Sequence, residues 1–524
     1  MKIFKRVIAF LLVLCFVGVA FVGCNNKKNN EDETNGGSNG PNGNTAIPTN
    51  EYGEVSFDGV VPKDELDFEG EKITIMHRET KISSREWYKQ ITEDELDEAV
   101  AMRNETVKSE LNVELAYEPI PYGAGYDDFA ARFNNIISSD VMNDFHYYDI
   151  AANFAYCGAY PAVRDYAANL RDKDTFPFFE FSLPCWNQAI VNNTTMNGRL
   201  HYVSGDLNLS LFDAAMVIWY NKTLYDAKKG EEDPDNMQLY ALEGLWTYDE
   251  LYMWASRLYE NTNGADQGKD PQDTYGFCLP RYSHTSDSVP YAWDLEFLIN
   301  NPDGTHEFNI IGNNKAEDAF IKWNNLIDAN GNCRTGATVE YFASGCYVFY
   351  PSTIYPDEKA NMTIREMEDK YGLLPIPKYD ADQENYGTTS ADFYTLITVL
   401  DHKGSTVPTK GEAISAVLQL MAEESYTSVR GYYFNRIIKP KYFGTDDSEG
   451  TVTNSIALFD IIIDNIEFEY WTIYSAQLNN IAWLWRDSFR DNKTSLGAAY
   501  SEQTQKYEEA IKATDIWLGL RSAD

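Results

Sequence analysis

The sequence contains many side chains that could act as acids, bases or ligands, but few in an order typical of catalysis. It has 81 Asp and Glu, 6 His and 7 Cys among 524 residues. Paired carboxylates suit glycoside hydrolysis, yet so many acids produce such pairs by coincidence. There is no GxSxG, HExxH or Walker motif, and Gly123-Ala124-Gly125 is only a fragment of a dinucleotide fingerprint. We therefore expect no enzymatic activity and no cofactor.

Patterns for metal binding and disulfides are also poor. Asp380 to Glu384 resembles the start of an EF-hand loop, but Asn385 replaces the required Gly and Ala391 the bidentate Glu. We interpret this stretch as a solvated acidic turn. The cysteines after residue 24 have scattered spacings without a CxxC pair, which favours buried free thiols over a disulfide framework or a metal site. They are Cys157, Cys185, Cys278, Cys333 and Cys346.

The one cysteine with a chemical context is Cys24. Lys2, Lys5 and Arg6 precede an apolar run over residues 7–22, and a polar, Asn-rich tract follows Cys24. This order is typical of an export signal. It resembles the lipobox of bacterial lipoproteins, which implies a signal peptide over 1–23 and lipidation of the Cys24 thiol, although Phe21 stands where Leu is usual. The alternative is a short membrane anchor, but about 16 apolar residues fall just below the length a spanning helix needs.

Charge and composition limit the partners of the exported chain. The net charge is -38, and removal of the leader takes away three basic and no acidic residues. Such a surface repels nucleic acid and anionic lipid headgroups. The length and the 44% hydrophobic content predict at least two domains. We expect a soluble monomer held at a membrane by its N-terminus.

Hydrophobic patterns predict an α/β organisation. Residues 25–50 are rich in Asn and Gly and are expected to be disordered, so that 24–69 forms a tether. A strand is predicted over 72–77, a helix after the capping box Thr92–Glu95 and a second strand over 113–117, which together form a βαβ unit. Similar boxes at Thr247–Glu250 and Thr409–Glu412 predict two further helices, the first ending at Gly264. Another helix is predicted around 319–327, closed by Gly331.

Three ordered segments carry a resemblance to a known family. They cover Asn197–Leu251 (with Gly205-Asp206, Trp219-Tyr220-Asn221-Lys222 and Gly244-Leu245-Trp246-Thr247), Phe342–Phe349 and Tyr371–Gly387. Each is more readily architectural than ligand-binding when taken alone. Their order and spacing over about residues 70–520 resemble the family 1 extracellular solute-binding proteins, the group that includes maltose-binding protein.

This resemblance implies a two-lobed periplasmic-binding-protein-like fold of type II, with discontinuous lobes joined by hinge strands. The first lobe would comprise 70–205 and 338–388, and the second 206–337 and 389–524. The implied function is delivery of a carbohydrate to an ABC permease from a cleft that closes on it. Two alternatives stay open: a surface glycoside hydrolase or polysaccharide-binding lipoprotein, and a peptide or amino-sugar ligand on the same fold.

Within that fold, aromatic rings beside polar groups near strand ends are the expected sugar-binding residues, because rings cover apolar sugar faces while polar groups bond the hydroxyls. The candidates are Trp186, Asp206, Tyr282, His284, Trp293, Tyr350, Asp392 and Tyr394. Trp483 and Trp485 cannot share one helix face and are interpreted as packing residues, although a helix lining the cleft could contribute one of them.

Overall fold

The computed structural model describes most of the chain after residue 54. The described residues are 55–80, 85–87, 95–123, 126–262, 264, 270–279, 284–328, 337–355, 358–402, 410–438 and 450–522. The leader, Cys24, the Asn-rich tract and Tyr282 lie outside them. Residues 55–69, predicted as the end of the tether, instead pack on the folded chain: Val61 is buried, and Phe57 lies edge-on against Tyr426 with ring centroids 5.5 Å apart.

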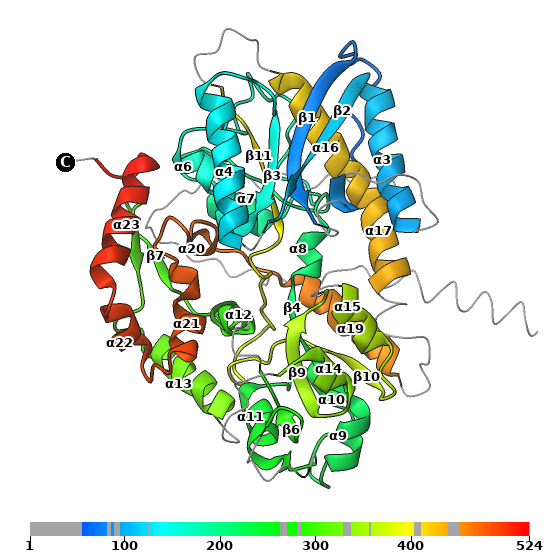
Figure 1. Cartoon of the computed structure of the whole chain (residues 1–524), viewed down its shortest axis with the longest axis vertical. Coiled ribbons are helices and arrows are strands. Elements are labelled where there is room, and N and C mark those ends of the chain that lie inside the picture. Colours follow the sequence, from blue (N-terminus) through cyan, green and yellow to red (C-terminus); the bar gives the residue numbers. More distant parts are fainter. Residues whose placement is uncertain are drawn as a thin grey trace, which may run out of the picture. The chain divides into compact units, whose positions relative to one another are not determined.

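The first sheet contains the predicted βαβ unit. Strands β1 (Glu71–Glu79) and β2 (Val113–Pro121) are parallel and are joined by α3 (Glu95–Leu111), which confirms that prediction. Strand β3 (Ile150–Phe154) is parallel to β1, and β11 (Thr395–Val399) pairs antiparallel with β3. The order is β11-β3-β1-β2. Strand β11, which comes late in the chain, therefore forms one edge of the sheet that contains the earliest strands, β1 and β2 (Figure 1).

Helices cover both faces of the first sheet. Because successive side chains of a strand point to opposite faces, neighbouring residues of β1 belong to different cores. Ile75 belongs to a core with residues of α3 and α16 (Gly411–Glu424), whereas Met76 belongs to a core with residues of α4 (Tyr126–Met142). Figure 1 shows α4 on one side of this sheet and α3 and α16 on the other. Strands β3 and β11 are buried at every position, as expected where both faces are covered, whereas the edge strand β2 leaves Glu114 and Glu118 exposed.

The second sheet overturns part of the predicted division into lobes. Its order is β10-β4-β9-β6-β5, with β4 (Met216–Asn221) between β9 (Tyr347–Thr353) and β10 (Tyr371–Leu374), followed by β6 (Thr274–Phe277) and β5 (Tyr259–Glu260). Residues 338–388 were predicted to return to the first lobe, but their strands β9 and β10 instead belong to the second sheet. Conversely, β11 and α16 belong with the first sheet, although 389–524 was assigned entirely to the second lobe. The reason is strand pairing over long sequence separations, which local patterns do not encode.

The chain passes between the sheets through paired segments. Val203 forms an antiparallel bridge with Ile397, and Ala215 forms one with Ser390. The segments 203–215 and 390–397 thus run side by side from one sheet to the other. Thr388 also bridges Ile466 in parallel. The lobe boundaries predicted at about residues 205 and 388 lie within or beside these segments.

The predicted helices form, with differences at their ends. Helix α11 (Tyr248–Arg257) begins after Thr247, but the Thr247 side chain makes no capping hydrogen bond, and the helix ends well before Gly264. The chain turns into strand β5 there instead. Helix α13 (Asn314–Asp328) matches the helix predicted around 319–327, and α16 begins at Gly411, within the third predicted box. Thr92, Gly331 and Thr409 lie outside the described residues.

Two of the motif segments meet in space. The Trp246 indole N–H donates to the carbonyl of Pro375 at 2.9 Å, and the backbone N–H of Tyr248 donates to the carbonyl of Lys378 at 2.8 Å. Asn221 has φ -84° and its side chain accepts from the N–H of Leu224, so it caps α9 (Lys222–Lys228). The motifs are architectural: they join helix starts to strand ends.

The cysteines differ in part from the prediction of free thiols. Cys157 and Cys185 are free and buried, and Cys346 is free and half-buried, as expected. Cys278 is disulfide-bonded, contrary to the expectation. The pairing of cysteines far apart in sequence depends on the fold, so the scattered spacing did not reveal it.

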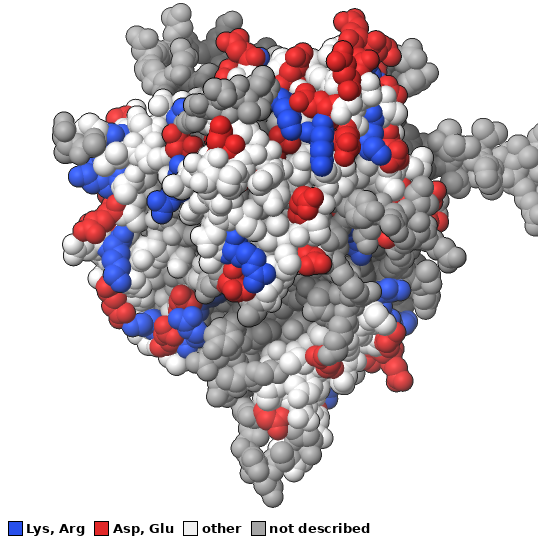
Figure 2. Space-filling view, turned by 45° about the horizontal axis from the view of Figure 1, so that its top comes forward, with Lys and Arg blue, Asp and Glu red and all other residues white. Residues whose placement is uncertain are grey.

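Surface charge is uneven on the face drawn in Figure 2. Acidic side chains gather along its upper edge, basic side chains lie among them, and the central area is largely uncharged. On this face the described residues form no continuous basic patch of the kind that binds nucleic acid. In the described part of the chain, no helix has the length and apolar character needed to cross a membrane.

Candidate functional site

A small cavity of about 40 Å³ lies beside the crossing segment 390–397, where it meets residues near 155, 285 and 470–483. Residues after β3 contribute one wall, the start of α12 (Thr285–Ala292) and residues before β11 contribute two more, and the C-terminal helices close it. It is lined by Ala155, Tyr156, His284, Asp287, Thr389, Ser390, Ala391, Asp392, Tyr394, Phe468, Thr472, Ser475, Ala482 and Trp483.

Two aromatic rings face each other at this site. Tyr156 is the second residue of the short helix α5 (Ala155–Gly158), which directly follows β3, and Trp483 is the last residue of the short helix η3 (Ile481–Trp483). Their ring centroids are 4.7 Å apart with an interplanar angle of 13°. The backbone N–H of Tyr156 donates to the carbonyl of Asp392 at 3.1 Å, which fixes the position of the Tyr156 backbone relative to the crossing segment.

A carboxylate network surrounds the Trp483 edge. The Trp483 indole N–H donates to Asp392 Oδ2 at 3.2 Å. Arg486, in α21 (Leu484–Arg490), has Nη2 3.4 Å from Asp392 Oδ2 and Nη1 3.3 Å from Asp287 Oδ2. Its guanidinium carbon also lies 4.6 Å from the Trp483 ring centroid, within cation–π range. One arginine therefore joins two acids and a ring.

The two acids differ in protonation. Burial works to raise the pKa of Asp392, but His284, 3.5 Å away, together with Arg486 and Trp483, outweighs it and lowers that pKa to about 2. Burial raises the pKa of Asp287 to about 7 despite the nearby Arg486. At neutral pH, Asp392 is a fixed anionic acceptor, whereas Asp287 exchanges between donor and acceptor forms.

This arrangement suits a polar ligand with apolar faces. A ring such as Trp483 covers the C–H face of a sugar, and the acids and Arg486 can bond hydroxyls that would otherwise be buried without partners. In the structure the two rings touch each other. A sugar ring between them requires a centroid separation of about 7–8 Å, twice a normal carbon–carbon contact. Entry of a ligand therefore requires the Tyr156 and Trp483 segments to separate.

Three of the eight predicted binding residues lie at this cavity. His284 and Asp392 have side chains 35% and 26% exposed, and Tyr394 is a buried ring packed 4.9 Å from Phe468. The structure brings these three together, and their part in binding stays a prediction. Tyr282 lies outside the described residues.

The other four predicted residues are placed elsewhere. Trp186 is 1% exposed in the core beside α16, where its indole N–H donates to Gln419. Asp206 is buried 3.3 Å from Arg430. Trp293 is fully buried and donates to the carbonyl of Pro377, and Tyr350 stacks on Phe342 inside the core. These four side chains do not line the cavity, because each is packed in the core or, in the case of Asp206, paired with Arg430.

The sequence did not suggest Tyr156, Asp287 or Arg486. Trp483 was interpreted as a packing residue, with the alternative that a helix lining the cleft could contribute it or Trp485. The sequence signal for Trp483 was its spacing of two from Trp485, which puts the two rings on different sides of a helix. In the structure Trp485 is 1% exposed, whereas Trp483 is half-buried. No local signal identified Tyr156, because its partners come from distant segments.

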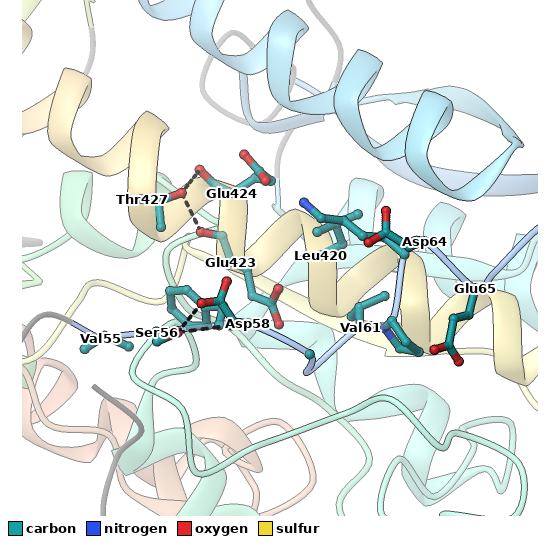
Figure 3. Close-up of a pocket in the computed structure, with 14 residues that line it drawn as sticks. Val55, Ser56, Asp58, Val61, Asp64, Glu65, Leu420, Glu423, Glu424 and Thr427 are labelled. Atoms are coloured by element: carbon teal, nitrogen blue, oxygen red, sulfur yellow. Dashed lines mark hydrogen bonds between the residues drawn. The ribbon is translucent and has the colours of Figure 1, made fainter. Parts of the chain in front are cut away.

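A larger cavity of about 640 Å³ lies between residues 55–65 and the C-terminal end of α16 (Figure 3). Its lining includes Asp58, Asp64, Glu65, Glu423 and Glu424. Burial raises the pKa of Glu423 to about 7. This cavity is lined by no residue of the crossing segments 203–215 and 390–397, so separation of those segments would not change it. We therefore regard the smaller cavity as the candidate site.

Comparisons with known proteins bear on the fold. No protein-family model matches the sequence, and no curated protein matches it. Among solved structures, the sugar-binding protein MalE from Xanthomonas citri is 13% identical with a TM-score of 0.55 and covers 86% of this chain and 100% of its own. The GacH receptor of Streptomyces glaucescens, solved unliganded and with acarbose, is 14% identical with a TM-score of 0.51, over 84% and 99%. An ABC substrate-binding protein from Listeria monocytogenes in complex with cycloalternan is 12% identical with a TM-score of 0.51, over 85% and 99%. The chain therefore has the α/β, two-lobed periplasmic-binding-protein-like fold of type II that the resemblance implied.

Proposed function

We propose that this protein is a family 1 extracellular solute-binding protein that binds a carbohydrate between its lobes and delivers it to an ABC permease. The single observation that carries the proposal is the site where Tyr156, Asp392 and Trp483, from three distant segments, converge at the crossing between the sheets. Solved structures with a similar fold were determined in complex with acarbose, cycloalternan and maltotetraose. Binding and closure are the whole mechanism, and closure is favoured only by contacts the open form lacks.

A glycoside hydrolase on the same fold is the second candidate. The observation in its favour is that Asp287 and Asp392 have pKa values of about 7 and 2, a divergence typical of acid and base pairs. Against it, both Asp392 oxygens face protein groups: Trp483 and Arg486 on one side and His284 on the other. A carboxylate held this way suits positioning better than attack on a sugar carbon.

We propose further that Cys24 is lipidated and holds the protein on the extracytoplasmic face of the membrane. The support is the order of charges, apolar run and cysteine in residues 1–24. Mass spectrometry of the protein from membranes tests this proposal. A mature N-terminal Cys24 carrying a diacylglycerol is expected, and an intact leader would contradict it.

Isothermal titration separates binding from hydrolysis. The exported part of the chain is titrated with maltose, maltotetraose, acarbose and cycloalternan, with a free amino sugar and a short peptide as probes of the other ligand classes. The same mixtures are then examined for released sugars. Saturable binding of an oligosaccharide without new products supports the proposal, and product formation supports the hydrolase. Binding confined to the peptide would contradict both.

A further inference from the structure

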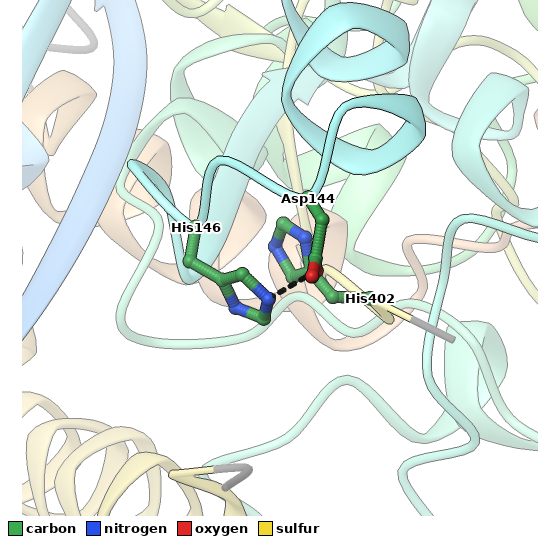
Figure 4. Close-up of side chains that lie close together, drawn as sticks. All are labelled: Asp144, His146 and His402. Carbon is green, nitrogen blue, oxygen red and sulfur yellow. Dashed lines mark hydrogen bonds and ion pairs between the residues drawn. The ribbon is translucent and has the colours of Figure 1, made fainter. Parts of the chain in front are cut away.

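A second cluster of chemically competent side chains lies in the first sheet, at the end opposite the candidate carbohydrate site. Asp144 and His146 lie in the loop between α4 and β3, and His402 follows β11 (Figure 4). Tyr156 and Asp392 adjoin the other ends of β3 and β11. The five paired residues from Ile150 to Phe154 span about 13 Å at about 3.3 Å each, so the two sites are separate.

The three side chains present their ligand atoms together. One nitrogen or carboxylate oxygen from each of Asp144, His146 and His402 lies within 4.8 Å of the others. His146 Nε2 is 2.5 Å from Asp144 Oδ1, and the two imidazole rings are stacked with centroids 3.9 Å apart. Two imidazoles and a carboxylate form a common ligand set for zinc and other divalent transition metals.

His402 provides an independent indication of a ligand. Its side chain is only 8% exposed, and Nε2 faces the carboxylate of Asp140 at 3.6 Å and the carbonyl of Tyr148 at 3.4 Å. Both neighbours are acceptors, so they favour the tautomer that carries its proton on Nε2. Nδ1 then holds a lone pair, and this buried atom has no hydrogen-bond partner among the described residues. A buried acceptor without a partner is costly, and a metal ion would satisfy it.

Asp140 is placed to orient His402. Its side chain is 2% exposed, and its oxygens accept from the backbone N–H groups of Tyr147 at 2.9 Å and Tyr148 at 3.3 Å. Metal-binding histidines commonly turn their second nitrogen toward such a carboxylate or a backbone carbonyl, which fixes the ring. Asp140 is thus a positioning residue rather than a ligand.

We infer that Asp144, His146 and His402 bind a divalent transition-metal ion, for which Zn²⁺ is the natural candidate. Zinc bonds of about 2.0–2.2 Å require the ligand atoms to approach one another. The stacked rings cannot both aim at one ion, so His146, whose side chain is 21% exposed, turns about its Cβ–Cγ bond. Water from the adjacent cavity of about 700 Å³, which His146 and His402 both line, completes four-coordination.

The ion would join the α4–β3 loop to the end of β11. Its function would be to stabilise one edge of the first sheet, independently of any sugar. This inference departs from the sequence-based expectation of no metal site. The sequence could not reveal the cluster, because His402 lies far along the chain from Asp144 and His146 and no spacing motif connects them.

Zinc titration of the exported chain, purified without a histidine tag and stripped with chelator, tests the inference. One equivalent is expected to bind, with a rise in the thermal midpoint, and Co²⁺ is expected to give a visible absorption band typical of four-coordination. The variants His402→Gln and His146→Asn are expected to lose the tight equivalent and the band. His146→Asn is the safer variant for folding, because its side chain is partly exposed and Asn tolerates the positive φ of 53° found there.

The matched control is His201→Gln. His201 lines the same cavity, but its Nδ1 contacts the carbonyl of Ala168 at 3.0 Å and it lies outside the cluster. This control is expected to bind zinc like the parent, whereas Asp140→Asn is expected to weaken binding about 10- to 100-fold. Absence of a stoichiometric equivalent in the parent, or equal binding by the folded His146→Asn variant, would overturn the inference.

Discussion

Replacing Trp483 by Ala tests the candidate carbohydrate site directly. The ring is half-buried, stacks on Tyr156 and donates to Asp392, so its removal changes the site more than the core. If a sugar covers about a quarter of a tryptophan surface of roughly 200 Å², the lost contact is worth about 1.3 kcal/mol at about 25 cal/mol/Å². Specific ring geometry adds about 0.5–1.5 kcal/mol. The sum predicts a Kd raised roughly 20- to 100-fold.

The assay is isothermal titration with whichever oligosaccharide the parent binds, together with thermal unfolding of each variant. Trp483→Phe keeps a ring and removes only the indole donor, so its Kd is expected within a few-fold of the parent. Trp485→Phe is the matched control: this tryptophan is two positions away, 1% exposed and packed against Phe297 and Phe320. A folded Trp483→Ala variant whose Kd stays within two-fold of the parent would refute the site.

Four further perturbations follow from the structure. Burial raises the pKa of Asp287 to about 7, so its contribution to stability is fully present below pH of about 4 and is lost as pH rises through 7. The melting temperature of Asp287→Asn should therefore rise relative to that of the parent as pH increases from 5 to 8. Arg486→Met leaves Asp287 and Asp392 without their shared cation and should lower the free energy of unfolding in urea by about 3–5 kcal/mol. Arg486→Lys should have an intermediate effect, and a loss below about 1 kcal/mol for Arg486→Met would contradict the network. Trp186→Ala should cost about 3–5 kcal/mol while the folded variant keeps its sugar Kd, because Trp186 lies in the core. Gly205→Ala would put a Cβ 2.2 Å from the carbonyl oxygen of Cys185 and should lower the melting temperature, whereas Gly431→Ala, with open space around it, should not.

The residues at the candidate cavity that the sequence suggested and those that it did not suggest differ in the kind of information they require. Asp392 was chosen because it lies beside a predicted crossing between the lobes, a position that the family resemblance supplied, and the structure places it at the candidate cavity. Trp186 and Trp293 were chosen by the same reasoning and are core residues. A ring beside a polar residue has the same sequence pattern in either setting. Only packing distinguishes a ring that meets ligand from one that meets Gln419 or Pro377.

The sequence by itself determined the local elements: the βαβ unit over 71–121, the starts of α11 and α16, and the order of motifs that pointed to a two-lobed fold. Periodicity and helix-start patterns act between residues a few positions apart, so they can be read from a single chain. Tertiary structure decided which sheet β9, β10 and β11 joined, and it brought Tyr156 to Trp483 and His146 to His402. Those pairings depend on contacts between segments far apart in sequence. Such contacts form and stabilise the protein only when the chain is folded, so local sequence patterns do not show them.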